Sequence, residues 1–163
     1  MRRFAFVLAV VLWTAGTPFA ASNTQPLYDE AADARTQIAS AVALAGRSGK
    51  NVVLVFGANW CGDCHDLDAA MRQSELATLI AKNYVVVHID VGRFDRNLDV
   101  ASHYGVPIRK GIPALAVLNP QGKPLYAQDQ GQFANASAMS FDSFKSFFER
   151  WKPKRQPHVR RET

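Results

Sequence analysis

The sequence of 163 residues is poor in cysteine, with only two. This excludes a disulfide-dense extracellular scaffold, which needs several cysteine pairs. With 48% hydrophobic and 20% charged residues, the composition also excludes a disordered or collagen-like chain and is that of one ordinary globular domain. Because a domain of this size buries roughly 70% of the surface of its unfolded chain, its core needs neither a disulfide nor a metal. The two cysteines are therefore free for chemistry.

No apolar run is long enough to span a bilayer. The run from Phe4 to Trp13 covers about ten residues, whereas a spanning helix needs roughly 20. It follows Arg2 and Arg3 and ends in small residues around Ala20–Ser22, which is typical of a secretory signal peptide. We interpret residues 1–21 as a cleaved signal and expect a periplasmic or secreted protein without a stable membrane span.

The body of the chain also lacks an excess of basic residues. The net charge is +5, but the two ends carry most of the positive charge, and residues 22–151 hold 12 basic and 13 acidic side chains. Such a body offers no footprint for nucleic acid. The basic segment 152–163 contains two prolines and no apolar stripe, so we expect a disordered, solubilising tail. Contact of this tail with anionic lipid or an acidic partner is the alternative.

What the chain does contain is an alternation of helical and strand patterns. Strands are expected over 52–56, 84–89, 114–118 and 123–127, the last two as an antiparallel hairpin. Helices are expected over 29–47, over 62–81 with a kink or new cap at 73–74, over 97–103 capped by Asn97, and over 141–151 capped by Ser140. This order predicts a single α/β domain over 22–151, with a central mixed sheet and helices on both faces.

The chemistry is expected at the sequence Trp60-Cys61-Gly62-Asp63-Cys64-His65, which follows the first strand and opens a helix. The helix N-terminus favours a thiolate on Cys61, which would attack a partner disulfide. Cys64 would then attack the mixed disulfide and release the partner. This predicts a thiol-disulfide oxidoreductase with protein thiols and disulfides as partners.

Three alternatives use the same residues. A purely structural disulfide between cysteines three apart closes a very short loop and would constrain the unfolded chain little. The spacing Cys-x-x-Cys-His also attaches c-type haem, with His65 as iron ligand, but the motif follows a strand and no residue is favoured as the sixth ligand. Zinc lacks a second ligand pair at structural spacing. We therefore expect no metal and no cofactor.

The order of strand, Trp60, the cysteine pair, helix, and Gly111-Ile112-Pro113 before a strand resembles the thioredoxin superfamily over about residues 50–151. The resemblance implies a thioredoxin-like fold with a cis Pro113 facing the disulfide. It also implies that Ile112 pairs with an extended substrate segment, whereas Pro113 alone would read as the start of a strand.

Departures from that family bear on the direction of electron flow. Thioredoxins proper carry a buried aspartate at the position that corresponds to Val55, and Gly62-Asp63 replaces the usual Gly-Pro. The segment 104–111 is also longer, with Pro107, Arg109 and Lys110. These features resemble secreted bacterial thioredoxin-like proteins and the C-terminal domain of the thiol:disulfide interchange protein, which implies a membrane electron donor.

Charges beside the cysteines act in opposite directions. Asp63 disfavours a thiolate on Cys61, and protonated His65 favours it. We hypothesise that Asp63 dominates and makes the protein a reductant. His88 and Asp90, at the end of the second strand, are either proton relays to Cys64 or solvated strand-end residues. A non-catalytic binding module, with a groove beside Pro113, is the alternative to an enzyme.

Overall fold

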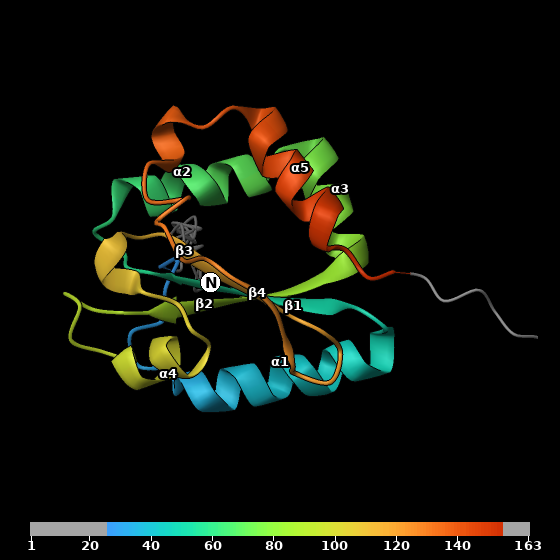
Figure 1. The fold of residues 1–163 in the computed structure, drawn as a ribbon, viewed down its shortest axis with the longest axis horizontal. Helices are drawn as coiled ribbons and strands as arrows, with labels where there is room; N and C mark the ends of the chain where they lie inside the picture. Colours follow the sequence, from blue (N-terminus) through green and yellow to red (C-terminus); the bar gives the residue numbers. More distant parts are fainter. Residues whose placement is uncertain (1–25, 155–163) are drawn as a thin grey trace, which may run out of the picture.

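The computed structural model describes residues 26–154, so the expected signal peptide and all but the first three residues of the basic tail lie outside the described chain. A four-stranded sheet lies between two layers of helices (Figure 1). Its strands are β1 (Asn51–Gly57), β2 (Tyr84–Asp90), β3 (Ala114–Leu118) and β4 (Pro124–Ala127), in the order β2-β1-β3-β4. The pair β1·β2 is parallel, and β1·β3 and β3·β4 are antiparallel. The predicted α/β fold with a mixed sheet is confirmed.

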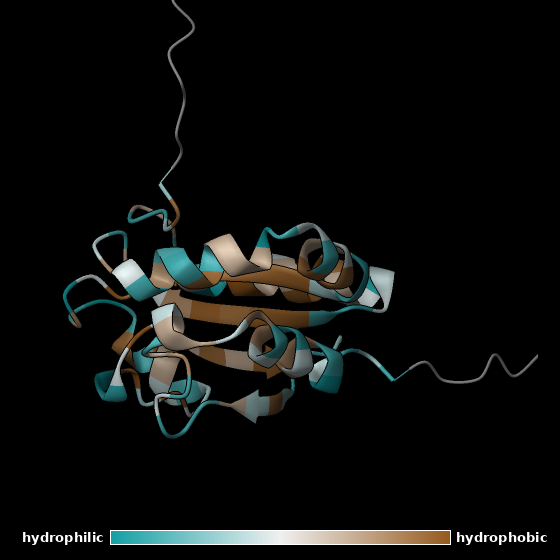
Figure 2. Cartoon of the chain, turned by 90° about the horizontal axis from the view of Figure 1, so that it is seen from above, coloured by the Kyte–Doolittle hydropathy of each residue, from teal (hydrophilic) through white to brown (hydrophobic). Residues whose placement is uncertain are grey.

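Apart from Asn51 at the start of β1, the two central strands have no polar side chain, because helices cover both of their faces. Every residue of β1 and of β3 is buried. Continuous runs of Val, Leu, Ala and Phe fit this double burial, whereas a sheet open to water on one side would alternate. Figure 2 shows the strands in brown, as a hydrophobic layer between helices in which hydrophilic and hydrophobic residues are mixed.

Helices α1 (Ala34–Ser48) and α4 (Leu98–His103) lie on one face of the sheet, and α2 (Gly62–Met71), α3 (Ser74–Asn83) and α5 (Phe141–Trp151) lie on the other (Figure 1). The first face packs small and aliphatic side chains of α1 against β1, and the second collects aromatic side chains of α5. Within residues 26–154, no helix has the length and apolar character needed to cross a membrane.

The helix expected from residue 29 begins five residues later. The Asp33 carboxylate accepts a hydrogen bond from the Thr36 backbone N–H (2.7 Å) and caps α1, so residues 29–32 form a turn instead. The apolar spacing of Ala31 continued the helical pattern by chance. This turn carries Tyr28 and Glu30 toward the sheet end that bears the cysteines.

The helix expected over 62–81 is two helices. Of the kink and the new cap considered for residues 73–74, the new cap is correct: Gln73 is the N-cap residue of α3, which begins at Ser74. Asn97 is the N-cap residue of α4, as predicted, but its side chain makes no capping hydrogen bond. Asn97 has a left-handed backbone (φ 52°), and its side-chain amide donates to the Asp90 carbonyl (2.7 Å). The Ser140 cap of α5 is confirmed, and Phe144 and Phe148 of that helix enter the core.

Candidate redox site

The two cysteines lie where β1 passes into α2. Cys61 is the N-cap residue of α2 and Cys64 lies in its first turn; their Cα atoms are 5.2 Å apart and their sulfurs form a disulfide. The backbone N–H of Cys64 points at the Cys61 sulfur (3.2 Å), so sulfur takes the place of the oxygen that usually caps a helix. Cys61 is 5% exposed and Cys64 is 1% exposed. The helix N-terminus can therefore stabilise a thiolate on Cys61.

The segment before β3 closes the site from the other side. The Ile112 carbonyl oxygen lies 3.6 Å from the Cys61 sulfur, although 51 residues separate the two in the chain. The Ile112–Pro113 peptide bond is cis, and both residues are buried. Just before them, Ile108–Lys110 forms a short 3-10 helix, η1, and Lys110 donates to the Asp129 carbonyl (2.8 Å).

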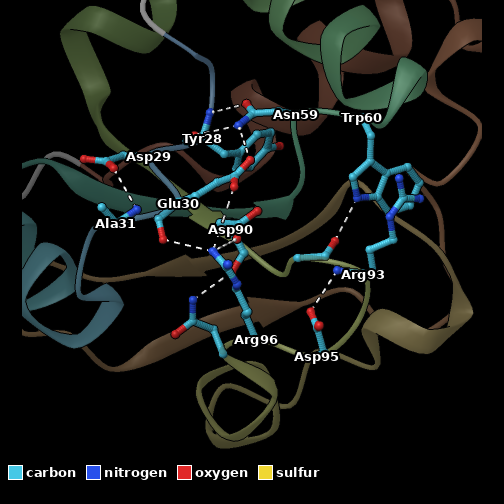
Figure 3. A network of polar contacts seen from close by, with 12 residues as sticks. Tyr28, Asp29, Glu30, Ala31, Asn59, Trp60, Asp90, Arg93, Asp95 and Arg96 are labelled. Atoms are coloured by element: carbon cyan, nitrogen blue, oxygen red, sulfur yellow. Dashed lines mark hydrogen bonds and ion pairs between the residues drawn. The ribbon is translucent and has the colours of Figure 1, made fainter.

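Trp60 stands on the surface beside the disulfide, with 47% of the residue exposed. Its indole N–H donates to the Gly92 carbonyl (2.8 Å), and the Arg93 guanidinium lies 5.2 Å from the ring centroid. The edge of the Phe94 ring faces it as well, at 6.0 Å between centroids. Figure 3 shows the hydrogen bond from the indole to the loop after β2 and Arg93 beside the ring. An exposed, held aromatic ring of this kind can contact a substrate chain.

The polar residues of the motif are fixed by backbone groups and one hydroxyl. Asp63 accepts hydrogen bonds from the backbone N–H and the hydroxyl of Ser137, both at 2.9 Å. The Nε2 of His65 lies 2.8 Å from the Asn59 carbonyl oxygen. Because a carbonyl only accepts, Nε2 carries the proton in this contact. Gly62 is exposed, and a Cβ there would meet nothing within 4 Å.

His88 and Asp90 occupy different environments at the end of β2. The expectation of a solvated strand end is wrong for Asp90, which is 5% exposed and paired with Arg96 (3.3 Å). Burial lowers the pKa of His88; the Asp68 charge opposes this shift and Arg72 reinforces it. The described contacts bring neither residue into hydrogen bonding with Cys64.

Three residues at this site were missed in the sequence: Tyr28, Gly57 and Asn59. The Asn59 side chain pairs with the Tyr28 backbone in both directions, accepting from its N–H and donating to its carbonyl, each at 2.9 Å. A Cβ on Gly57 would lie 2.2 Å from the Tyr28 hydroxyl oxygen and 2.8 Å from the Cys64 sulfur, so only glycine fits. A glycine at the end of an otherwise apolar strand was the available signal.

The arrangement offers thiol-disulfide chemistry and no evident metal centre. Among residues 26–154, the acidic, histidine and cysteine side chains form no group of three that could hold a metal ion. The Cys61 sulfur, the N-terminus of α2 and the Ile112 carbonyl lie together instead, an arrangement that suits thiol-disulfide exchange.

Comparison with known proteins agrees with this chemistry. A family model described as thioredoxin-like matches residues 33–120. The crystal structure of a disulphide isomerase from Xylella fastidiosa Temecula1 is 48% identical, with a TM-score of 0.74 over 78% of this chain and 97% of that one. The oxidised C-terminal domain of DsbD from Neisseria meningitidis is 22% identical, with a TM-score of 0.52 over 74% of this chain and 97% of that one, and it shares the fold.

One curated relative is much longer than this chain. The probable nucleoredoxin 3 of Oryza sativa subsp. japonica is 28% identical over 58% of this chain. The matched part is 24% of that protein's length.

Proposed function

The chain belongs to the thioredoxin-like family and carries the cysteine pair of a thiol-disulfide oxidoreductase; on that premise, we propose that it reduces disulfides of exported proteins in the periplasm. The observation that carries the proposal is the Cys61–Cys64 pair at the N-terminus of α2, closed over by Ile112.

In the proposed reaction, the Cys61 thiolate attacks a substrate disulfide. A mixed disulfide forms and the first substrate thiolate leaves. The Cys64 thiolate then attacks the Cys61 sulfur, which breaks the mixed disulfide and releases the second substrate thiolate. Two electrons have passed to the substrate, both released thiolates take protons from water, and Cys61 and Cys64 end as a disulfide. A thiol donor must reduce this disulfide before the next cycle.

Trp60, Ile112 and Pro113 are the proposed substrate contacts. Trp60 is exposed and held by the loop after β2, and the buried Ile112–Pro113 segment lies against the Cys61 sulfur. Gly62, between the two cysteines in sequence, is exposed and has open space around its Cα. These residues would bind an extended backbone rather than a particular side chain, which suits protein disulfides of varied sequence.

The reducing direction rests on Asp63. Asp63 lies in the first turn of α2, between the two cysteines in sequence, and Ser137 holds its carboxylate with two hydrogen bonds. A negative charge there disfavours the Cys61 thiolate, stabilises the disulfide relative to the dithiolate and makes the couple more reducing. His65 opposes this effect only when it is protonated.

Two measurements test the function and its direction. A Cys64→Ser variant should accumulate mixed disulfides on Cys61, and a Cys61→Ser variant should not; absence of any trapped partner would favour a binding module. Equilibration with glutathione should give a potential near the roughly −270 mV of thioredoxin. A value between about −180 and −120 mV would instead indicate an isomerase or an oxidant.

Asp63→Asn separates charge from structure, because an amide oxygen can still accept from Ser137. We expect the couple of this variant to become more oxidising. An unchanged or more negative potential would contradict the role of Asp63. Ser137→Ala is the matched control, since it removes one hydrogen bond and leaves the charge.

The location is part of the proposal and rests on residues 1–21. A basic start, a short apolar run and small residues support export. In an oxidising compartment the protein would need electrons from a membrane thiol donor. Cell fractionation with and without residues 1–21 tests this: the full chain should reach the periplasm in shortened form, and the truncated chain should remain inside the cell.

A further inference from the structure

The Tyr28 side chain is buried without a hydrogen-bond partner for its hydroxyl. The residue is 0% exposed, and in the described part of the chain its hydroxyl is the one buried side-chain oxygen or nitrogen that has no partner. A buried hydroxyl that lacks a partner is unfavourable, and native proteins rarely keep one. The hydroxyl is therefore available to donate to an acceptor that comes within reach.

The hydroxyl points to the redox pair. A Cβ built on Gly57 would lie 2.2 Å from this oxygen and 2.8 Å from the Cys64 sulfur, so the oxygen and the sulfur are at most 5.0 Å apart. Gly57 keeps an ordinary strand backbone as the last residue of β1. The absence of its side chain therefore serves to let Tyr28 and Cys64 approach each other.

The redox loop itself holds Tyr28 in this place. The two hydrogen bonds between its backbone and the Asn59 side chain fix its position, and Asn59 directly precedes Trp60 and Cys61 (Figure 3). The Tyr28 ring packs edge-on against the His88 ring, at 5.3 Å between centroids. The turn that follows is tied down as well, since Arg96 donates to the Glu30 carbonyl (3.0 Å).

We propose that the Tyr28 hydroxyl donates a hydrogen bond to the Cys64 sulfur whenever the Cys61–Cys64 disulfide is open. This inference rests on the proposed function and deepens it. In the mixed disulfide, Cys64 must give up its proton to water before it attacks Cys61. A donated hydrogen bond stabilises the resulting thiolate. Tyr28 keeps its own proton throughout, and the electron pair of the broken bond leaves with the substrate sulfur.

The surroundings of Tyr28 suit a donor and not a base. Burial raises the pKa of the phenol well above its ordinary value, and the charges of Asp68 and Asp90 raise it further. Asp68 is paired with Arg72, and Asp90 is paired with Arg96. The position of the family's buried aspartate is Val55, which packs in the apolar core on the α2 side of the sheet. Tyr28 thus provides a polar group beside Cys64 where β1 provides none.

The test compares Tyr28→Phe with Tyr84→Phe, a second buried tyrosine whose hydroxyl donates to the Phe148 carbonyl. In a Cys61→Ser background, the Cys64 pKa is read from the ultraviolet absorbance of the thiolate. With both cysteines present, stopped-flow kinetics give the rate at which Cys64 resolves a mixed disulfide between Cys61 and a small aromatic thiol. We expect Tyr28→Phe to raise the Cys64 pKa by about one unit and to slow resolution about three- to fourfold at neutral pH, because the more basic thiolate is also the better nucleophile. Tyr84→Phe should change neither quantity.

The pH profile is a further readout that a merely structural role would not move. The resolution rate should follow the Cys64 ionisation and shift to higher pH in Tyr28→Phe. His88, Asp68 and Asp90 also face this region, so His88→Phe serves as a control. If its pH profile matches that of the unaltered protein, the shift in Tyr28→Phe belongs to the hydroxyl.

An unchanged Cys64 pKa and resolution rate in folded Tyr28→Phe would overturn the inference. If that variant does not fold, hydroxyl proton exchange of Tyr28 in the unaltered protein decides the point, since exchange should slow on reduction. Equal exchange in both redox states would refute the contact. Failure of Cys61 to trap any partner would refute the proposed function instead, and the Cys64 titration would still test Tyr28.

Discussion

Two buried tyrosines lie at opposite ends of the parallel strand pair and differ in one respect. Tyr84 begins β2, where its hydroxyl donates to the Phe148 carbonyl (2.5 Å) and its ring packs edge-on against Phe148. Tyr28 lies beyond the other end of β1, next to Cys64, and its hydroxyl has no partner. The Tyr84 hydroxyl therefore contributes a hydrogen bond to the stability of the fold, whereas the similarly buried Tyr28 hydroxyl stays available to the redox site.

The closed end of the sheet, formed by Asn51, Tyr84, Phe148 and Trp151, completes its polar contacts within the protein. The Asn51 side chain, 2% exposed, donates to the Trp151 carbonyl (2.8 Å) and joins β1 to α5. The redox end, formed by Tyr28, Gly57, Cys61 and Cys64, is built around close approach of polar and sulfur atoms. The difference indicates that the closed end stabilises the fold. At the redox end, the Tyr28 hydroxyl without a partner lowers the stability next to the cysteine pair.

Removing the central aromatic side chain of the closed end should have the largest effect on stability. Phe148→Ala is expected to lower the free energy of unfolding by about 3–5 kcal/mol, because it opens a cavity in the core between the sheet and helices α2, α3 and α5. The potential of the folded variant should stay unchanged. Denaturant unfolding and glutathione equilibration check this, with the partly exposed Leu125→Ala as control. A shifted potential would show that the two ends are coupled.

Adding a side chain at Gly57, in the redox end, should lower the free energy of unfolding less than Phe148→Ala does, but it should disturb the redox pair as well. Gly57→Ala is expected to destabilise the protein by about 1–3 kcal/mol, because the new methyl group overlaps the Tyr28 hydroxyl and the Cys64 sulfur. Gly62→Ala is the matched control, since nothing lies within 4 Å of its Cβ. Equal unfolding midpoints for the two variants would contradict the close approach at Gly57.

The tyrosine pair gives a smaller and more direct comparison. Tyr84→Phe should cost roughly 1 kcal/mol, because the Phe148 carbonyl loses its donor. Tyr28→Phe of the oxidised protein should cost nothing or stabilise it, because a hydroxyl without a partner disappears. Thermal and denaturant unfolding of the oxidised variants measure both. Similar losses in the two variants would mean that the tyrosines do not differ as described.

The pH dependence at His88 should be the smallest effect. Burial lowers the folded-state pKa of His88 below its ordinary value, so the unfolded chain binds a proton more readily. The contribution of His88 to the free energy of unfolding should be fully present above about pH 6.5, and the stability should decline as the pH falls below that value. His88→Phe keeps the ring contact with Tyr28 and should flatten this decline, whereas the exposed His103→Gln should not. An unchanged slope in His88→Phe would contradict the burial argument.

Local patterns predicted most of the fold. The strands of the sheet, the break at Gln73 and the Ser140 cap follow from apolar runs, turn residues and cap residues that neighbours in sequence decide. Two details depend on polar side chains and differ from the prediction. α1 begins only at Ala34, where the Asp33 carboxylate caps it, and the Asn97 side chain bonds to the Asp90 carbonyl of β2 and makes no cap for α4.

By itself, the sequence determined the α/β fold and the cysteine pair at the start of a helix, because these features depend on periodicity and on spacings of a few residues. Only the tertiary structure decided that Tyr28, Gly57 and Asn59 belong to the redox site and that Asp90 is buried. Tyr28 reaches Cys64 across 36 positions of the sequence, and no local pattern specifies which distant side chain fills the space that a glycine leaves. That choice comes from the packing of the whole chain.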